Sequence, residues 1–338
     1  MADGVRLSLP RREQDMNRRD FLQLAAGATA AGMLPGGAWA QDNKTVRITL
    51  PSAGSAGSAW RPLVGQYKLD SDLGITLDWL TADPGKMQVQ LSAGSLDVGV
   101  FGSVGLATLA NRGSDIVLFG PALNNHGRWI VRGDSPYKSP KDLVGKRIAT
   151  TAETSETYQQ ARIAASLTGL DLKKDVKVIF GSPTANLALF ERGDVDGIIT
   201  LEPTATRLVG RGAREIARVA DIWKEATGQA DDPFLVGLAA SKSWFEQNRA
   251  TAAKLATLFE RIGTTVAQHP DSLKPIAAEL GLKADETQAI DLLPRRLAPT
   301  YATKWDASVF ATMDKQVEVA VKLGLLDAVP ARKLYVKA

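Results

Sequence analysis

Short β-branched runs alternate with longer amphipathic runs from residue 44 onward. This alternation is typical of βαβ units and of a mainly parallel sheet. It predicts a first set of strands at residues 46–50, 75–80, 98–101 and 116–121. A second set is predicted at residues 129–132, 147–150, 176–180 and 197–201. The pattern therefore indicates an α/β chain with two small open sheets.

Two passages connect the sets: ALNNHGRW at 122–129 and DDPFLVGLAAS at 231–241. The C-terminal third has the spacing of amphipathic helices, with apolar residues recurring on one helix face. The residues with this spacing are Leu255, Phe259, Ile262 and Val266, and later Phe310, Met313 and Val317. We assign all of them to the core.

The N-terminal segment NRRDFLQLAAGATAAGML, at 17–34, has the features of a twin-arginine export signal. Its apolar run is too short to span about 30 Å of hydrocarbon, and the small residues of AWA at 38–40 suit a peptidase. We expect residues 1–40 to be removed, and Met16 is an alternative start. The remaining length favours two lobes: residues 41–124 with 232–338, and residues 125–231.

The amino-acid composition argues against several classes of function. The 41 basic and 37 acidic residues are dispersed, which argues against nucleic acid as a partner. The absence of cysteine excludes disulfides, thiolate catalysis, iron–sulfur ligation and a lipid-modified cysteine. With two histidines and no ligand set, we expect no metal and no cofactor. The mature protein should be free in the periplasm.

Four loops follow predicted strands and lead into predicted helices. In open α/β sheets, ligands bind beyond the carboxyl ends of strands, where helix N-termini favour oxyanions. Each loop alone is typical of an ordinary N-cap or turn, but four of them in two facing sheets favour one shared cleft. The candidate residues are Ser55, Ser58 and Trp60; Gly102 and Ser103; Thr151, Ser155 and Glu156; Glu202; and Asn124 in the first connection.

Three segments resemble the periplasmic solute-binding proteins for nitrate, sulfonate and taurine. They are LSAGSLDVGVFGSVG at 91–105, SPKDLVGKRIAT at 139–150 and LFERGDVDGIITLEPTATRLVGRG at 189–212. The resemblance implies a type II fold with two mainly parallel lobes, joined by two crossing segments. It also implies a monomer that delivers a solute to a membrane permease and ATPase. The resemblance implies that Ser103, Thr151 and Ser155 lie in the cleft. Asp97 and Asp196 are interpreted as structural turn residues.

The two candidate glutamates, Glu156 and Glu202, affect which ligand charge is expected. A carboxylate facing a sulfonate or nitrate would be repulsive unless it paired with a cationic part of the ligand. If Glu156 or Glu202 faces the cleft, a zwitterion such as taurine, or a heterocyclic amine, becomes a more favourable ligand than nitrate. Alternatively, each is an exposed helix-start residue or the partner of an arginine such as Arg207.

The leading hypothesis is a non-enzymatic binding protein for a small organic anion or zwitterion, of the aliphatic sulfonate or taurine type. An enzyme on the same fold, hydrolase or desulfinase-like, is an alternative. The desulfinase chemistry of similar proteins needs a cysteine, and a hydrolase would have to use His126 or His269. A ligand-sensing partner of a membrane receptor is the third possibility.

Overall fold

The computed structural model describes residues 44–81 and 84–337. These residues belong to one compact unit, Asp42–Ala338. The predicted export signal, residues 1–40, lies outside the described residues. None of the described helices is long and apolar enough to cross a bilayer.

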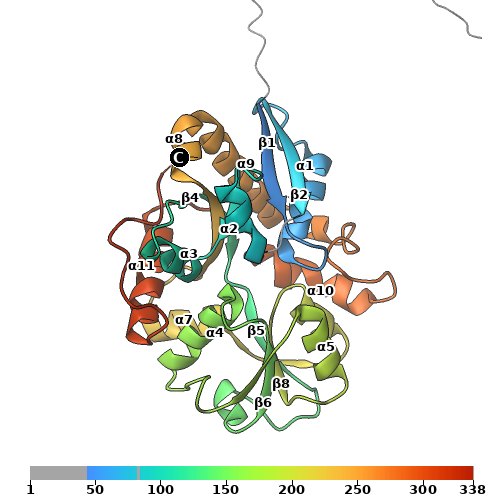
Figure 1. Ribbon diagram of the computed structural model, residues 1–338. Helices are drawn as coiled ribbons and strands as arrows, with labels where there is room; N and C mark the ends of the chain where they lie inside the picture. Colours follow the sequence, from blue (N-terminus) through green and yellow to red (C-terminus); the bar gives the residue numbers. More distant parts are fainter. Residues whose placement is uncertain (1–43, 82–83, 338) are drawn as a thin grey trace, which may run out of the picture. The chain divides into compact units, whose positions relative to one another are not determined.

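One group of strands occupies the upper part of Figure 1. Its strands are β1 (Lys44–Leu50), β2 (Ile75–Thr81), β3 (Gly99–Phe101), β4 (Val117–Asn124) and β10 (Phe234–Ala240). β1 pairs in parallel with β2, and β10 lies between β3 and β4. A parallel bridge between Ile48 and Val98 joins the two pieces, so they continue one another.

A second sheet has the order β7-β6-β8-β5-β9. Its strands are β5 (Gly127–Val131), β6 (Arg147–Thr150), β7 (Lys177–Phe180), β8 (Gly197–Leu201) and β9 (Arg214–Arg218). The three strands β7, β6 and β8 run parallel, as predicted. The molecule is therefore the expected two-lobed α/β fold, with the sheets β1-β2 and β3-β10-β4 in one lobe and the five-stranded sheet in the other.

One strand in each lobe runs against its neighbours. β10 is antiparallel to β3 and β4, and β5 is antiparallel to β8 and β9. These are the strands that the chain enters directly after crossing between the sheets. Because each begins at the boundary, it runs away from it, whereas the other strands run towards it. Each sheet is therefore mixed rather than simply parallel.

Helices cover both faces of each sheet. Those associated with the first group of strands are α1 (Trp60–Tyr67), α2 (Pro84–Ser92), α3 (Ser103–Asn111), α8 (Lys242–Gln247), α9 (Arg249–Gln268), α10 (Thr287–Leu297) and α11 (Ala307–Lys322). Those associated with the second sheet are α4 (Glu156–Leu167), α5 (Pro183–Glu191), α6 (Thr204–Gly210) and α7 (Val219–Thr227). Short 3₁₀ helices occur at Ala56–Ala59, Pro140–Leu143, Pro270–Leu273 and Ala298–Thr300.

The second sheet is buried on both faces because its side chains alternate between two apolar clusters. Trp129 and Val131 of β5 pack in a cluster with residues of α4 and α7. Ile130, between them, packs in a cluster with residues of α5 and α6. Figure 1 shows α4 and α7 on one side of this sheet and α5 on the other.

The predicted helical face of the C-terminal third forms part of the main core. Leu255, Phe259, Ile262 and Val266 are all buried on α9, as expected. Their cluster includes residues of β1, β4 and β10, whereas Met313 and Val317 of α11 pack in a second cluster with residues of α3. The helical spacing thus located two separate core faces.

The acidic turns recur in both lobes with one structural role. Asp97 accepts a hydrogen bond from the main-chain N–H of Arg47, at 2.9 Å. Asp196 accepts the equivalent bond from the main-chain N–H of Arg147, also at 2.9 Å. The glycine that opens each turn, Gly94 and Gly193, has a positive φ of 67° and 79°, which disfavours other residues. The interpretation of both aspartates as turn residues is confirmed.

Two strands differ from the sequence prediction. Residues 231–241 were expected to be a connecting passage, but residues 234–240 form β10, a central strand. β9, with the sequence REIAR, was not predicted because its charges mask the strand pattern. It is an edge strand, where one side needs no partner and charged side chains are tolerated.

We expect Gly263→Ala to destabilise the protein, because a Cβ at this position of α9 would lie 2.2 Å from the carbonyl oxygen of Ala302. Overpacking of this kind costs about 1–3 kcal/mol. Gly65→Ala on α1 is the control, since nothing lies within 4 Å of its Cβ. There, alanine should stabilise by up to about 1 kcal/mol. Urea denaturation measures both, and equal stabilities of the two variants would contradict the packing described.

Candidate functional site

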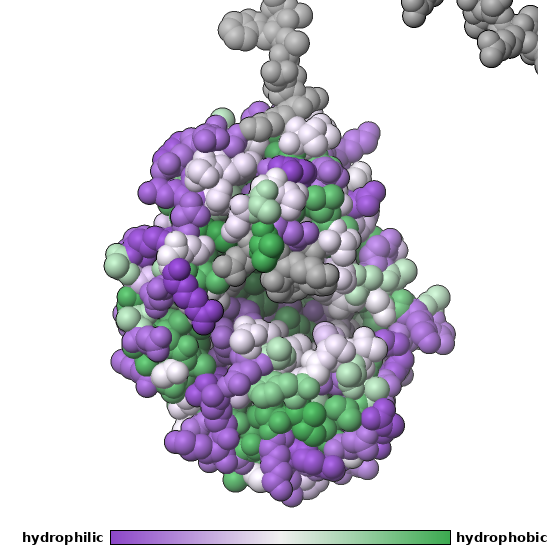
Figure 2. Space-filling view, in the orientation of Figure 1, coloured by the Kyte–Doolittle hydropathy of each residue, from purple (hydrophilic) through white to green (hydrophobic). Residues whose placement is uncertain are grey.

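The carboxyl ends of several strands meet helix starts at the boundary between the sheets. β3 leads into α3, whose N-cap is Gly102, and β6 leads to α4, whose N-cap is Ser155. The chain crosses from β4 to β5 at residues 125–126. Figure 2 shows a hollow in the middle of the face that it draws, below the atoms in grey.

Glu156 connects the two helix starts. It is the first residue of α4, and its Oε2 accepts a hydrogen bond from the main-chain N–H of Gly105 in the first turn of α3, at 3.2 Å. Its Oε1 accepts a second bond from the Gln160 side chain, at 2.8 Å. A carboxylate from one lobe is therefore bound by the helix N-terminus of the other, where a negative charge is favoured.

Two glutamines extend this contact into a buried network. Gln316 of α11 donates from its Nε2 to Gln160 Oε1 at 2.9 Å and to the carbonyl oxygen of Phe234 at 2.7 Å. Ser103 Oγ donates to Gln316 Oε1 at 2.8 Å. Ser103, Gln160 and Gln316 are all buried, so each polar atom in the network needs the partner it has.

Gly102 makes room for the glutamate. A Cβ at position 102 would lie 2.1 Å from Cδ of Glu156 and 2.4 Å from its Cγ. Real side chains do not approach so closely, so no other residue type fits here while Glu156 holds this position. The glycine predicted as a ligand contact is thus in contact with a side chain of the opposite lobe.

The carboxyl group of Glu156 is bound by neutral donors. Burial raises the pKa of the Glu156 carboxyl, and hydrogen bonds from Gln160, Gly105 and Val104 only partly offset that rise. No ion pair joins this carboxylate to a cation among the described residues. The carboxyl group therefore lies among neutral dipoles, whose effect on its pKa is smaller than that of burial.

The hydroxyl groups predicted in the same loop lie next to each other. Thr151 Oγ1 and Ser155 Oγ are 2.7 Å apart. Ser155 also caps α4 by accepting the N–H of Tyr158, at 3.3 Å. The structure thus brings Gly102, Ser103, Thr151, Ser155 and Glu156 together through direct contacts or within one loop.

Glu202 is engaged elsewhere. Its carboxylate is buried and pairs with Arg128 at 3.2 Å and with Arg296 at 2.9 Å. Its other oxygen accepts the N–H and the hydroxyl of Thr206, at 2.8 and 2.5 Å. Glu215 completes this cluster by pairing with both arginines. The arginine partnership expected for Glu202 is present, with Arg128 and Arg296 in place of Arg207.

The predicted ligand-binding residues of the first loop contact neighbouring parts of their own lobe. Ser55 Oγ donates to the carbonyl oxygen of Ser52, and Ser58 Oγ lies 2.7 Å from the carbonyl oxygens of Ser55 and Glu279. Trp60 is 1% exposed and packs edge-on against Phe259, with ring centroids 4.9 Å apart. In this structure Trp60 is a core residue, which favours a packing role.

The crossing from β4 to β5 holds a buried histidine. Nδ1 of His126 lies 2.8 Å from the carbonyl oxygen of Asn124, whose own side chain donates to the carbonyl oxygen of Pro299. Burial lowers the pKa of His126 to about 4, and the charge of Arg128 adds to this effect. His269 is exposed and stacks on Tyr67. Neither ring has a serine partner among the hydrogen bonds of the described residues.

Sequence reasoning missed Gln160, Gln316 and Phe180. Gln316 lies between Met313 and Val317 on the buried side of α11, and a polar residue in an apolar face was the available signal. Phe180 is 44% exposed at the carboxyl end of β7, and its ring contacts Tyr158 edge-on at 5.0 Å. The rule used for the four loops applies equally to this strand end.

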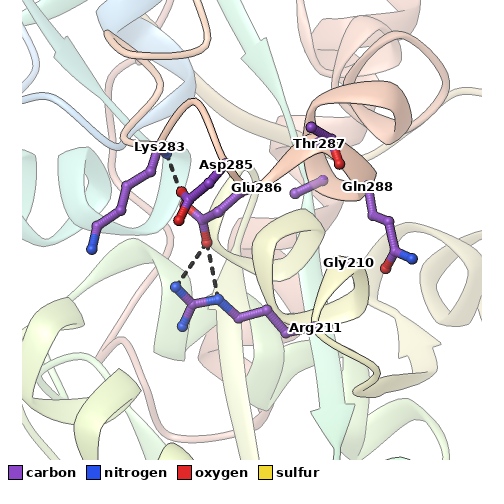
Figure 3. Close-up of a pocket in the computed structure, with 8 residues that line it drawn as sticks. Gly210, Arg211, Lys283, Asp285, Glu286, Thr287 and Gln288 are labelled. Atoms are coloured by element: carbon purple, nitrogen blue, oxygen red, sulfur yellow. Dashed lines mark hydrogen bonds and ion pairs between the residues drawn. The ribbon is translucent and has the colours of Figure 1, made fainter.

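A separate cavity of about 350 Å³ lies between the end of α6 and the start of α10. Figure 3 shows the Arg211 guanidinium and the Glu286 carboxylate facing each other at this cavity. Glu286 also accepts bonds from Arg207 and from the N–H of Lys283. Since this acid is fully paired, the cavity shows no unmet hydrogen-bonding demand at Glu286, and we assign it no ligand.

The two lobes, the crossing strands and the helix starts at their boundary define a protein of the type II periplasmic binding class. Residues 52–284 match the family of the ABC transporter, phosphonate, periplasmic substrate-binding protein, and the chain belongs to this family. Residues 15–35 match the twin-arginine translocation signal. The protein is therefore exported to the periplasm by the twin-arginine route.

Individual relatives cover smaller parts of the chain. The taurine-binding periplasmic protein of Escherichia coli K12 is 31% identical over 139 residues, which are 40% of this chain and 42% of that protein. An ATP phosphoribosyltransferase of Nitratidesulfovibrio vulgaris is 33% identical over 135 residues, 37% of this chain and 41% of the enzyme. The chain thus matches less than half the length of these curated relatives.

A solved structure shows the same fold over most of the chain. The periplasmic aliphatic sulphonate binding protein SsuA from Escherichia coli superposes with a TM-score of 0.68 at 21% identity. The superposition covers 87% of this chain and 93% of that protein. At this identity the likeness establishes the fold and not the ligand.

We expect Glu202→Gln to lower the free energy of unfolding by about 3 kcal/mol, because it leaves two buried arginines facing only Glu215. Glu191→Gln is the control, since Glu191 is paired with Arg211 but exposed, and such pairs contribute about 0–1 kcal/mol. Urea denaturation at neutral pH compares them. If the two variants lose the same stability, the cluster does not carry the role described.

We also expect His126 to make stability depend on pH. Its pKa is about 4 in the folded chain against 6.5 unfolded, so between these values the unfolded chain binds a proton that the native state does not. The free energy of unfolding should therefore fall as pH drops from 6.5 towards 4, by about 2 kcal/mol at pH 5. His126→Gln should remove this component, as measured by denaturation at pH 7 and pH 5. Parallel pH profiles of both proteins would contradict it.

Proposed function

We propose that the protein is the extracytoplasmic solute-binding subunit of an ABC importer. It captures a small organic anion or zwitterion, of the aliphatic sulfonate or taurine type, between its lobes. The observation that carries this proposal is the contact of Glu156 at the lobe boundary, since a main-chain N–H in the first turn of α3 donates to its carboxyl oxygen. Sulfonates and phosphonates present the same kind of acceptor oxygens.

The same geometry supports a proposal for the ligand contacts. The first turn of α3, with Gly102 and Ser103, binds the oxyanion, and the Thr151 and Ser155 hydroxyls approach it from the other lobe. Ser55, Ser58 and Asn124 line the rest of the cleft. Trp60 and Glu202 support the lobes rather than the ligand, since one is in the core and the other is saturated with donors.

We also propose that the two lobes move relative to each other about the crossings. Residues 41–124 with 232–338 form one lobe, and residues 125–231 form the other, with the crossings as hinges. The protein works as a monomer and presents its solute to a permease and ATPase in the inner membrane. The relatives that bind taurine and aliphatic sulphonate support this choice of solute class.

The proposal excludes turnover of the solute. The chain contains no cysteine, which removes thiolate chemistry. His126 is buried with a pKa of about 4 and is held by a main-chain carbonyl, so it is unsuited to act as a general base at neutral pH. His269 is exposed at the end of α9.

Thermal unfolding with a ligand panel tests the function. Protein from the periplasmic fraction should gain about 2.7 kcal/mol when its solute is at a hundredfold excess over the Kd, which raises Tm by about 5 °C. The panel comprises taurine, ethanesulfonate, methylphosphonate and nitrate. Calorimetric titration then measures the Kd, and mass spectrometry checks that the solute is recovered unchanged. A panel without any stabilising compound, or release of a product, would contradict the proposal.

A further inference from the structure

The outer strand of the second sheet ends in an exposed aromatic ring. Phe180 is the last residue of β7, and its side chain is 44% exposed. Every other aromatic residue in the described part of the chain is buried or partly buried. Because an exposed phenyl ring leaves apolar area in water, an apolar group that covers it binds favourably.

The strand register places this ring beside the hydroxyl groups of the candidate site. Phe180 pairs with Thr150, the last residue of β6, and the N–H of Gly181 donates to the carbonyl oxygen of Thr150 at 3.0 Å. Since β6 and β7 are parallel, both end at the same edge of the sheet. Thr151 follows directly, with its hydroxyl oxygen 2.7 Å from that of Ser155. The ring and the hydroxyl pair therefore share one edge.

Helix α4 holds the ring close to the other lobe. The Phe180 ring meets the buried ring of Tyr158 edge-on, with centroids 5.0 Å apart and an angle of 89° between the planes. The N–H of Tyr158 donates to the Ser155 hydroxyl, and Glu156 in the same turn contacts Gly105 of the first lobe. Figure 2 also shows hydrophobic residues below the hollow. The exposed ring thus lies against the turn of α4 that reaches the lobe boundary.

The two acids expected to favour a zwitterion are already engaged. Glu202 pairs with Arg128 and Arg296, so its charge is neutralised within the protein. Glu156 is bound by neutral donors, and burial raises the pKa of its carboxyl group, which weakens it as a partner for a cation. An ammonium group placed against Phe180 would lose water without gaining either carboxylate, which is unfavourable.

We propose that Phe180 binds the apolar tail of the solute, so that the protein prefers a sulfonate with a hydrocarbon chain to taurine. This inference rests on the proposed function, since it names the class of solute for the same site. Phe180 is then a specificity-determining residue: it contacts the tail and leaves the acidic head to the hydroxyl and main-chain donors.

Calorimetric titration of the wild type with a homologous series gives the first test. From methanesulfonate through ethanesulfonate to propanesulfonate, each added CH₂ should tighten binding about fourfold, the effect of burying one methylene group. Taurine has an ammonium group where propanesulfonate has a methyl group, and it should bind at least about tenfold more weakly than propanesulfonate. Equal Kd values along the series, or tighter binding of taurine, would overturn the inference.

Variants of Phe180 give the second test, with the ratio of the methanesulfonate and propanesulfonate Kd values as the readout. Phe180→Ser should bring this ratio to within about twofold of one, because the tail loses its apolar partner. Phe180→Leu keeps an apolar side chain and should retain most of the ratio. A general disturbance of the site would weaken both solutes alike and leave the ratio unchanged, so an unchanged ratio in Phe180→Ser would overturn the inference.

Val144→Ser is the matched control. Val144 is 54% exposed in the same lobe, but it precedes β6 and so lies at the opposite end of that strand from Thr150. This variant should keep the wild-type ratio, and the same loss as in Phe180→Ser would overturn the role of Phe180. If methanesulfonate binds and the ratio is one in the wild type, the inference alone fails. If no compound of the ligand panel or the series binds, the proposed function itself fails.

Discussion

The direction in which the chain enters each sheet after a crossing determines where everything else lies. β5 and β10 begin at the boundary and run away from it, antiparallel to their neighbours. The remaining strands therefore end at that boundary, and the helix starts that follow them gather there. Two sheets built in this way place main-chain donors of both lobes opposite each other, which explains how Glu156 of α4 reaches the first turn of α3.

Two acids, Glu202 and Glu156, illustrate two ways to hold a carboxyl group. Glu202 is fixed by Arg128, Arg296 and Thr206, and such a cluster is costly to break and contributes rigidity. Glu156 is held by neutral donors, with no cation among its described partners, and burial raises its pKa.

Much of the fold could be predicted from the sequence because strand and helix periodicities report burial directly. The α9 face, the acidic turns and most strands were located in this way, whereas REIAR of β9 was hidden by its charges. The site was only partly predictable. Strand ends marked Gly102, Thr151 and Glu156, but the pairing of Glu202 with Arg296 and the role of Gln316 depend on residues far apart in the chain. No local pattern encodes such contacts.

The position of β10 also affects how the chain folds. The second sheet is made from one continuous stretch, β5 to β9, so it can form as soon as that stretch is complete. The first sheet cannot close until β10 inserts between β3 and β4, which are separated from it by the whole second sheet. Late insertion of a central strand is slow, because a long loop must close first. During that interval the unpaired edges of β3 and β4 are the part of the nascent protein most exposed to wrong pairing, before export begins.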